Sequence, residues 1–513
     1  GEPAMQGYAI EHDKPFTYRK SFTVPADYAG KHTILRFDGV YSHARLFVNG
    51  TFVREHHGGF TRWETDVTPF VRPGKKNEIR LEVTDRLDDI SYASGYAHHP
   101  IGGILRDVTL FALPETCLYD FYAETHLDAA YEDAVLKIGY SSPVAGGAEV
   151  AYTLTEPSGR HYLLAQSRFP LEEGGNMNEL PVKNPLKWDA EHPNLYTLTV
   201  TLSKDGKEIG RFDRRIGFRD VKIEKDRMLV NGMPVKLRGA CRHDIHPTLG
   251  RTTTAELDSL DVILFKRSNM NFVRTSHYPP TERFLAYCDR YGIYVVDEAN
   301  VESHGMGYGD NTLAKAPAYA QAHMERNRRM VLRDKNHPSV IIWSMGNEAG
   351  MGPNFEACYR WIKEYDPSRP VHYERAVYDQ DGAFTDIICP MYWGYEQCEK
   401  YARNNPSKPL IQCEYAHAMG NSMGGLDHYW ELVRKYPSYQ GGFIWDFVDQ
   451  GLVRYEPDGR VSFLYGGDFN DYDATDNSFN CNGIIAPDRT WHPHAYEVQR
   501  QYQSIWTTPV DLA

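Results

Sequence analysis

The sequence contains no long hydrophobic segment, no excess of positive charge and no paired cysteine motif. No apolar run approaches the roughly 18–20 residues that a membrane-spanning helix needs, so we expect no membrane partner. The formal net charge of −13 also argues against nucleic acid as a partner. The eight cysteines form no C-x-x-C pair and several lie in predicted strands or helices, which predicts buried free thiols.

The chain begins with Gly1 rather than methionine, so we expect its native N-terminus to be missing. A cytoplasmic and a periplasmic location are both compatible with the sequence, and so is a homo-oligomer. Aromatic residues are abundant, with 35 tyrosines and 9 tryptophans. Aromatic faces suit sugar rings, but a large β-rich protein would also use many of them in its cores.

The first 219 residues read as two β-sandwich domains. Segments such as RKSFTVP, HTILRF, ARLFV and NEIRLEV alternate between apolar and polar residues or form short apolar runs, with Gly, Pro and Asp between them. Asn49-Gly50 between two such segments predicts a two-residue hairpin. We expect a jelly-roll β-sandwich over residues 1–115 and an immunoglobulin-like β-sandwich over residues 116–219.

The pattern changes near residue 220, where strands begin to alternate with helices. After a second hairpin signal at Asn231-Gly232, eight strand candidates follow: VKLRGACRH, FVRTSHYP, GIYVVDEAN, VIIWSMGNE, PVHYER, DIICPMYW, PLIQCEYAH and GGFIWDFVDQ. Segments with a helical period separate several of them, which predicts a (β/α)₈ TIM barrel over residues 220–513. A doubly wound open sheet is the alternative, but the glycine-rich phosphate loop typical of that fold is missing.

Polar residues gather at the carboxyl ends of nearly every predicted barrel strand. They are Arg242, His243, Arg274, Ser276, His277, Glu302, His304, Asn347, Glu348, Tyr392, Glu414, His417, Trp445 and Asp446. In a TIM barrel these ends converge on one face, where active sites lie. A single such residue is more often structural, but their repetition along consecutive strands predicts an active site.

Glu348 and Glu414 each end an apolar run, at the predicted fourth and seventh strands. Two carboxyl groups on one barrel face form the basic apparatus of glycoside hydrolysis. Because two neighbouring carboxylates cannot both ionise cheaply, one would keep its proton as general acid and the other would act as nucleophile. Arg274 and Tyr392 could hold the ionised one. The residues alone do not assign the two roles, and a structural salt bridge is the alternative for each.

Glu302 and His304 lie two residues apart after the third strand, so an extended chain would point both to one side. With Glu348 they could bind Mg²⁺ or Mn²⁺, and zinc is also compatible with these ligands. A hydrogen-bonded trio without metal is the alternative. Trp445 and Phe479 are candidates for a surface that stacks on a sugar, although a lone tryptophan on a strand is more often part of the core.

Several long motifs resemble glycoside hydrolase family 2, most closely its bacterial β-galactosidases. They are RHDIHP at 242–247, VRTSHYP at 273–279, VVDEANVESHGM at 295–306, RDKNHPSVIIWSMGNEAG at 333–350, DIICPMY at 386–392 and CEYAHAMGNSMGG at 413–425. The resemblance covers essentially the whole chain, from MQGY at 5–8 through both β-domains and the barrel. It implies a retaining, double-displacement exo-β-galactosidase that hydrolyses terminal β-D-galactosyl residues of oligosaccharides or glycans.

The resemblance also implies roles for individual residues. Glu348 matches the acid/base and Glu414 the nucleophile, while Glu302, His304 and Glu348 match magnesium (Mg²⁺) ligands. Residues matching those that position the galactosyl unit or the nucleophile are His243, Arg274, His277, Asn347, Tyr392, His417 and Trp445. Phe479 and Asn482 match residues of a sodium (Na⁺) site that adjoins the substrate.

Three features bear on specificity. The stretch GYAHHP at 95–100 carries no carboxylate where the large β-galactosidases have an acidic sodium and substrate ligand, which argues against the sodium site. The chain ends at Ala513, soon after the barrel, without the family's C-terminal domains. A β-glucuronidase of the same family is the alternative enzyme, but CNGIIAPDR lacks the lysine that grips a sugar carboxylate. A carbohydrate-binding protein with an inactive barrel is the other alternative.

Overall fold

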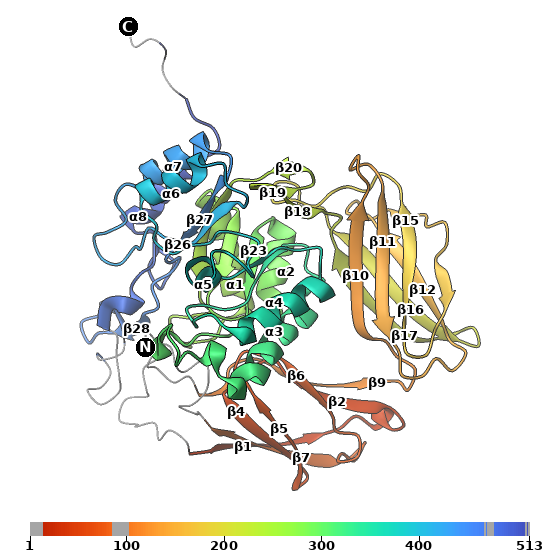
Figure 1. Ribbon diagram of the computed structural model, residues 1–513. Helices are drawn as coiled ribbons and strands as arrows, with labels where there is room; N and C mark the ends of the chain where they lie inside the picture. The colour runs from red at the N-terminus through yellow and green to blue at the C-terminus, as the bar shows by residue number, and fades with distance from the viewer. Residues whose placement is uncertain (1–13, 85–101, 466–467, 469–476, 508–509, 511–513) are drawn as a thin grey trace.

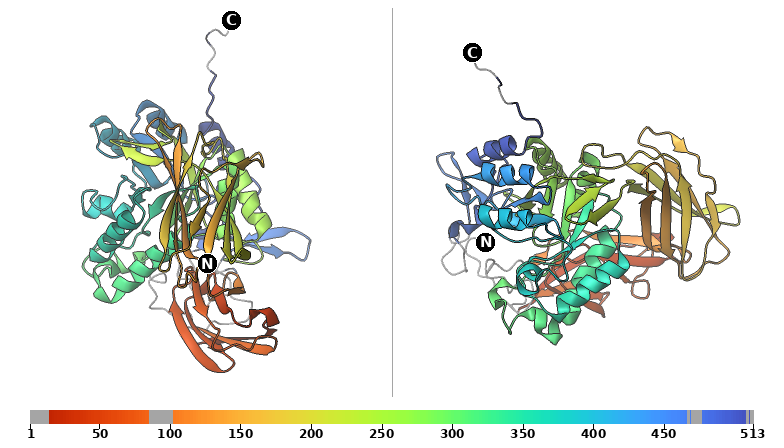
Figure 2. Two further views of the ribbon diagram at one scale, coloured as in Figure 1. Left: turned by 90° about the vertical axis from the view of Figure 1, so that its right-hand side faces the viewer. Right: turned by 45° about the horizontal axis from the view of Figure 1, so that its top comes forward.

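The computed structural model describes residues 14–84, 102–465, 468, 477–507 and 510. It contains two β-sandwich domains and a barrel, as Figure 1 shows, so the predicted fold class is confirmed. The left view of Figure 2 shows the first sandwich below the barrel, and the right view shows the second sandwich to one side of the barrel. No helix in the described ranges is both long and apolar enough to cross a membrane.

The first domain is a sandwich of antiparallel strands. One sheet has the order β1-β7-β4-β5 (Phe16–Thr23, Lys76–Thr84, His43–Val48, Thr51–His57) and another the order β6-β2-β9 (Trp63–Asp66, His32–Phe37, Val108–Leu113). Strands β3 (Val40–Tyr41) and β8 (Gly103–Ile104) form a short pair. Asn49 and Gly50 both have positive φ and join β4 to β5, as the hairpin signal predicted. Stacked Phe37 and Trp63 lie in the core between the sheets.

The second domain is a sandwich of two sheets. One contains β10, β11 and β15 (Tyr119–Leu127, Ala134–Ser141, Asn176–Val182). The other contains β12, β13, β14, β16 and β17 (Glu149–Thr155, His161–Tyr162, Arg168–Pro170, Tyr196–Lys204, Lys207–Ile216). The inward-facing apolar residues of alternate positions, such as Leu136, Ile138 and Val200, fill the core. A small sheet, β18-β19-β20 (Val221–Glu224, Arg227–Val230, Met233–Pro234), then leads into the barrel through the predicted Asn231-Gly232 turn.

The barrel contains seven parallel strands and an eighth, irregular segment. The sheet order is β25-β24-β23-β22-β21-β27-β26 (Val371–His372, Val340–Ser344, Tyr294–Glu298, Phe272–Thr275, Leu237–Arg242, Tyr439–Ile444, Leu410–Tyr415). Residues 386–392 close the ring, because the Asp386 N–H donates to the Val371 carbonyl and the Tyr392 N–H donates to the Glu414 carbonyl. All eight predicted strand positions therefore belong to the ring. Most strand residues are buried, which explains their continuous apolar runs.

Helices cover the outside of the barrel (Figure 1). They are α1 (Ala255–Arg267), α2 (Glu282–Tyr291), α3 (Ala320–Asp334), α4 (Pro353–Tyr365), α5 (Glu374–Asp379), α6 (Tyr395–Arg403), α7 (Leu426–Lys435) and α8 (Pro493–Gln501). The Thr254 side chain caps α1 by accepting a hydrogen bond from the Leu257 N–H, and Gly292 ends α2 in the left-handed conformation. Strands β28 (Leu452–Tyr455) and β29 (Val461–Leu464) form a hairpin beyond β27.

Candidate active site

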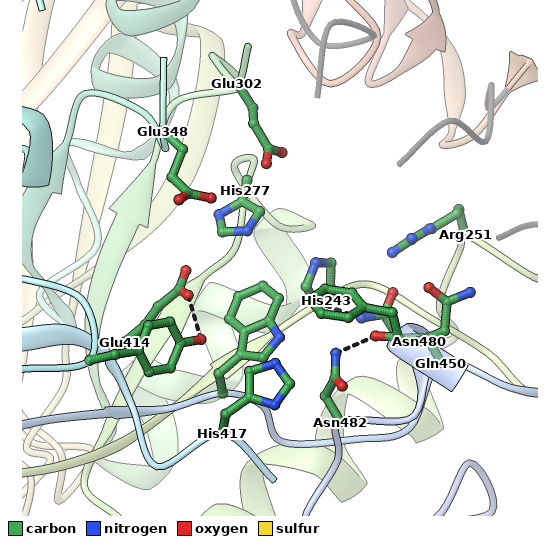
Figure 3. A pocket seen from close by; sticks show the side chains of 13 residues that line it. His243, Arg251, His277, Glu302, Glu348, Glu414, His417, Gln450, Asn480 and Asn482 are labelled. Atoms are coloured by element: carbon green, nitrogen blue, oxygen red, sulfur yellow. Dashed lines mark hydrogen bonds between the residues drawn. The ribbon is translucent and has the colours of Figure 1, made fainter. Parts of the chain in front are cut away.

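A pocket of about 280 Å³ opens at the carboxyl ends of the barrel strands (Figure 3). It is lined by His243, Arg251, His277, Glu302, Glu348, Tyr392, Glu414, His417, Trp445, Gln450, Phe479, Asn480 and Asn482. Ten of these were predicted from the sequence, whereas Arg251, Gln450 and Asn480 were not. The predicted residues Arg274 and Asn347 are buried next to the pocket rather than lining it, and His304 does not line it but has its Nε2 4.0 Å from Glu348 Oε1.

Glu414 is held at the end of β26 by hydrogen bonds to both of its carboxylate oxygens. Arg274 Nη1 donates to Oε1 at 2.8 Å, and the Tyr392 hydroxyl donates to Oε2 at 2.9 Å. One donor is a permanent cation and the other lies on the irregular segment that closes the barrel. Two donors, one of them charged, stabilise a carboxylate anion and fix its orientation.

Arg274 binds a second carboxylate on its other side. Its Nε and Nη2 donate to Glu298 Oε2 and Oε1 at 2.8 and 3.0 Å, the bidentate geometry that suits a buried pair. Burial opposes ionisation of Glu298, but Arg274 and His277 outweigh it and lower the pKa of Glu298 to about 2. Arg274 Nη2 also donates to Asn347 Oδ1 at 2.7 Å, which turns the Asn347 amide nitrogen toward Glu302 at 3.3 Å.

Glu348 has a contrasting environment at the end of the fourth strand. Burial raises its pKa, and the carboxyl groups of Glu414, Glu374 and Glu302 add to this, so that the pKa reaches about 9. The Tyr308 hydroxyl donates to Glu348 Oε1 at 3.0 Å. The Glu348 N–H donates to Glu374 Oε1 at 2.8 Å, and burial raises the pKa of Glu374 to about 7.

A left-handed turn in the backbone places Glu348 in the pocket. Its φ is +40°, and Gly346 two residues earlier has φ +151°. A Cβ atom on Gly346 would lie 2.6 Å from the Val301 carbonyl oxygen, so only glycine fits there. The Asn347 N–H donates to the same carbonyl at 2.9 Å, which ties this turn to the segment that carries Glu302.

Two histidines and Trp445 form one wall of the pocket. The rings of His277 and Trp445 stack at 5.1 Å, and His243 meets Trp445 edge-on at 5.4 Å. Burial lowers the pKa of His277, but Glu302 and Glu298 outweigh it and place that pKa above its ordinary value. Burial lowers the pKa of His243 well below its ordinary value. Trp445 is 7% exposed, so it belongs to both the core and the pocket wall.

The end of the pocket beyond this wall contains buried polar atoms that no described residue satisfies. They are two donors, Trp445 Nε1 and Asn480 Nδ2, and two acceptors, Gln450 Oε1 and Asn482 Oδ1. The Asn482 Nδ2 donates to the Phe479 carbonyl, so the amide oxygen is the atom left for a ligand. Buried polar groups normally have partners, so unsatisfied ones in a pocket mark places where a ligand or water binds. A sugar hydroxyl, which donates and accepts, suits such a mixture.

Three supporting residues escaped the sequence reasoning, namely Glu298, Tyr308 and Glu374. Glu298 and Glu374 carry the same signal as the residues that were predicted, because each lies at or just after the end of a barrel strand. Tyr308 comes from the loop after the third strand, where nothing in the sequence pattern indicates that its hydroxyl reaches Glu348.

Glu302, His304 and Glu348 suit a divalent cation in donor type and charge. His304 Nε2 and Glu348 Oε1 lie 4.0 Å apart, and two ligands of Mg²⁺ at about 2.0–2.1 Å are at most about 4.2 Å apart. The possible ligand atoms of these three residues do not all lie within 4.8 Å of one another. Two other groups of three possible metal ligands in the described ranges do meet this distance. The chain is not extended between Glu302 and His304, because Ser303 has a ψ of 39° and a 3₁₀ turn begins at His304, so the alternation of an extended chain does not apply to this pair.

The sodium prediction rests on fewer groups. Phe479 and Asn482 lie together, since the Asn482 amide donates to the Phe479 carbonyl oxygen, and Asn482 Oδ1 is buried without a described partner. These two oxygens are fewer than a hard cation usually takes from its surroundings. The segment 95–100, whose lack of a carboxylate argued against this site, lies outside the described residues. Sodium binding stays a prediction.

A TIM barrel with two glutamates at its carboxyl face has the arrangement that glycoside hydrolases use, and comparison with known families identifies the family. Residues 221–507 match the family model described as "Glycosyl hydrolases family 2, TIM barrel domain". Residues 8–114 match the sugar binding domain of the same family, and residues 116–219 match a third model, "Glycosyl hydrolases family 2". The chain belongs to glycosyl hydrolase family 2.

Curated relatives are bacterial proteins named beta-galactosidase. One from Aeromonas hydrophila is 42% identical over 512 residues, which cover 96% of this chain and 49% of the relative. One from Photobacterium profundum is 40% identical over 94% of this chain and 48% of its own length. The chain therefore spans about half the length of the curated relatives that it matches.

Solved structures with the same fold include β-glucuronidases. The Ruminococcus gnavus beta-glucuronidase superposes with a TM-score of 0.81 at 22% identity, covering 98% of this chain and 90% of the other. The Bacteroides uniformis beta-glucuronidase gives a TM-score of 0.78 at 24% identity, covering 96% and 63%. At such low identity these likenesses show the fold and not the substrate.

Proposed function

We propose that this chain carries the catalytic unit of a retaining exo-β-galactosidase. It would hydrolyse terminal β-D-galactosyl residues of oligosaccharides or glycans by double displacement. Relatives named beta-galactosidase at 40–42% identity support the sugar, and the mixture of unpartnered donors and acceptors in the pocket supports a neutral glycone. The unequal surroundings of Glu348 and Glu414 carry the proposal.

The first displacement uses the two glutamates in different protonation states. Glu414 accepts hydrogen bonds from Arg274 and Tyr392, which suits an anionic nucleophile, while Glu348, with a pKa near 9, holds a proton at neutral pH. A Glu414 oxygen attacks the anomeric carbon as Glu348 gives its proton to the leaving oxygen, and the glycosidic bond breaks. The product is a galactosyl ester of Glu414 and a free alcohol.

The second displacement needs Glu348 to act as a base. The charge of Glu414 and its loss during the reaction explain how Glu348 can do so. The charge of Glu414 is the largest of the nearby charges that raise the pKa of Glu348. Ester formation removes that charge, so the pKa of Glu348 falls during the reaction. Glu348 then takes a proton from water, whose oxygen attacks the anomeric carbon and releases Glu414.

Magnesium would bind to Glu302, His304 and Glu348 in this proposal. A bound divalent cation supplies positive charge that offsets the carboxyl groups of the site. The protein's own contribution is to hold these donors: Asn347 Nδ2 lies 3.3 Å from Glu302 Oε1, and burial lowers the pKa of His304, which keeps its imidazole neutral for binding.

One observation favours an acidic sugar instead. Arg251 is the one lysine or arginine among the described residues that line the pocket, and a cation there could bind the carboxylate of a uronic acid. The acceptors Gln450 Oε1 and Asn482 Oδ1 at the same end oppose this, because they would repel a carboxylate. A β-glucuronidase is therefore the second candidate.

Hydrolysis of a substrate panel tests the proposal. The chain is assayed with nitrophenyl β-galactoside, β-glucuronide and β-mannoside, next to its Glu414→Gln variant as the inactive control. We expect preference for the galactoside, and loss of at least roughly 10³-fold in kcat for the variant, because the nucleophile is gone. A preference for the glucuronide would reassign the substrate, and no release from any of the three would favour a binding protein.

A further inference from the structure

Gln450 lines the pocket from the loop after β27 and is 7% exposed. Its amide nitrogen Nε2 lies 3.2 Å from His243 Nδ1 and donates to Asp446 Oδ2 at 3.2 Å. Its amide oxygen is buried and has no hydrogen-bond partner among the described residues. The backbone of Gln450 is fixed as well, since its N–H donates to the Asn480 carbonyl at 2.8 Å.

The contacts of His243 Nδ1 bear on where the ring carries its proton. Gln450 Nε2 is the nearest of its partners at 3.2 Å and can only donate, whereas Asp446 Oδ2 and Ser276 Oγ lie farther away, at 3.4 and 3.5 Å. This geometry favours an accepting Nδ1 and a ring proton on Nε2. Burial lowers the pKa of His243 well below its ordinary value, which leaves a neutral ring with one N–H. That N–H is on the ring nitrogen opposite Gln450, and no described residue accepts from it. Figure 3 shows His243 between His277 and Gln450 in the pocket wall.

The opposite orientation of the Gln450 amide is less favourable. It would turn the amide oxygen toward His243 Nδ1 and Asp446 Oδ2, one of which would then have to carry a proton on the facing atom, and it would leave two amide hydrogens without a partner in place of one oxygen. The orientation seen here lets one amide nitrogen serve both Asp446 Oδ2 and His243 Nδ1 and leaves a single acceptor, Oε1, for a ligand.

We propose that Gln450 is a specificity-determining residue for the glycone, which accepts a hydrogen bond from a sugar hydroxyl through Oε1 and holds His243 in the tautomer that donates to a sugar oxygen through Nε2–H. The proposal rests on the proposed function for the identity of the sugar. A hydroxyl can satisfy both partners because it donates and accepts, whereas a carboxylate only accepts and would leave Gln450 Oε1 facing a negative charge. Sites built to bond a hydroxyl reject analogues that lack it.

The first test measures the tautomer and needs no substrate. The chain is labelled with ¹⁵N-histidine, and the His243 signals are assigned by their loss in His243→Gln. In the parent chain we expect His243 to show the ¹⁵N chemical shifts of a neutral imidazole ring that is protonated on Nε2. In Gln450→Glu, the new carboxylate accepts from Nδ1, so the proton should move to Nδ1 or both nitrogens should be protonated. Nδ1 protonation in the parent chain, or identical signals in Gln450→Glu, would overturn the role in positioning His243.

The second test measures coupling between Gln450 and one hydroxyl. kcat/KM is measured with nitrophenyl β-galactoside and its 3-, 4- and 6-deoxyfluoro analogues, in the parent chain and in Gln450→Met. Fluorine cannot donate a hydrogen bond. For one analogue we therefore expect kcat/KM to fall, relative to the unmodified galactoside, by roughly 10- to 100-fold more in the parent chain than in the variant. Comparing the two proteins cancels the electronic effect of fluorine on the reaction. Equal losses for every analogue would contradict the contact with Oε1.

The matched control is Gln499→Met on α8, whose amide donates to the Arg267 carbonyl on the surface. It should behave as the parent chain, and thermal unfolding of each variant verifies that it folds. If the parent chain did not hydrolyse the galactoside, the proposed function would be wrong, but the tautomer of His243 could still be measured. Failure of the proposed function can therefore be told apart from failure of the role assigned to Gln450.

Discussion

Arg274 and Glu414 form the charged contact on which the site is built, with Nη1 2.8 Å from Oε1. The side chain of Arg274 is 1% exposed, and the same guanidinium binds Glu298 through two further hydrogen bonds. One buried cation therefore faces two carboxylates. Removing Arg274 would leave unpaired buried charges on its partners. A substitution of Arg274 would therefore change both the stability of the fold and the rate of catalysis, and the two effects could not be separated. Tyr392 offers a cleaner way to test the surroundings of Glu414.

Tyr392→Phe removes the uncharged donor to Glu414 and leaves the ion pair intact. We expect kcat to fall by roughly 10²- to 10³-fold, because the hydroxyl orients the nucleophile and this loss is typical of one removed active-site donor. The melting temperature should change by no more than a few degrees. Steady-state kinetics and thermal unfolding measure both, with Tyr455→Phe, 74% exposed on β28, as the control. A large drop in melting temperature with unchanged kcat would assign Tyr392 a structural role.

Glu348 should set the alkaline limit of activity. Its pKa of about 9 means that the proton needed for the leaving group is lost as the pH rises through that value. We expect kcat/KM for lactose to fall above about pH 9 and this limb to disappear in Glu348→Gln, whose activity with an activated nitrophenyl leaving group should survive in part. Equal loss on both substrates would contradict the role as acid. Glu364→Gln, exposed on α4, is the control.

The same pKa has a consequence for stability. A carboxyl group whose pKa is higher in the fold than in the unfolded chain binds more protons when folded, so its contribution falls as the pH rises from the unfolded value near 4.5 to about 9. Glu348→Gln removes the charge and should stabilise the fold at pH 8, by on the order of 1–3 kcal/mol. Denaturant unfolding in chelator, at pH 5 and pH 8, measures the difference. A variant less stable than the parent at pH 8 would show that the carboxylate is well solvated.

The sequence predicted the architecture and most of the pocket because both depend on short-range patterns. The apolar runs ending in Glu348 and Glu414 are continuous because their strands are buried on all sides, and the strand ends must converge in a closed barrel. Gln450 was missed although it ends the predicted segment GGFIWDFVDQ, because the observed strand stops at Ile444 and the loop that follows brings Gln450 into the pocket. Arg251 was missed because it lies in the loop between β21 and α1. His304 shows the other limit: its spacing from Glu302 would place both side chains on one side only if the chain were extended, and the backbone turns at Ser303 and His304.

Removal of divalent cations should affect the parent chain more than a variant of the proposed site. Chelation of magnesium should lower kcat/KM of the parent chain by roughly 10- to 100-fold. In His304→Ala, kcat/KM should already be low before chelation, and chelation should change it little. Titration calorimetry with Mg²⁺ should show binding that His304→Ala weakens. His428→Ala, on α7 and exposed, is the matched control. Unchanged magnesium affinity in His304→Ala would leave the hydrogen-bonded trio as the better account of these residues.

Arg106 connects the first domain to the loop that carries His243. Its Nη2 lies 3.1 Å from Asp244 Oδ2 and donates to the Pro279 carbonyl at 2.6 Å, and burial lowers the pKa of this guanidinium. Asp244 follows His243 directly and is also bound by Arg242 Nη1 at 2.7 Å. Because Asp244 keeps the Arg242 contact, Arg106→Met should leave the barrel folded while loosening the His243 loop.

We expect Arg106→Met to lower the free energy of unfolding by about 2–4 kcal/mol, since a buried, hydrogen-bonded ion pair and the hydrogen bond to the Pro279 carbonyl are lost. KM should rise by roughly 10-fold with a smaller change in kcat, because His243 is proposed to bind the sugar rather than to react. Denaturant unfolding and steady-state kinetics with nitrophenyl β-galactoside measure the two effects. Arg45→Met, which breaks an exposed pair with Glu82, should change stability by less than about 1 kcal/mol. If Arg106→Met lowered kcat and left KM unchanged, the contact would act on the reacting glutamates rather than on sugar binding, and the first domain would contribute to chemistry instead of to affinity.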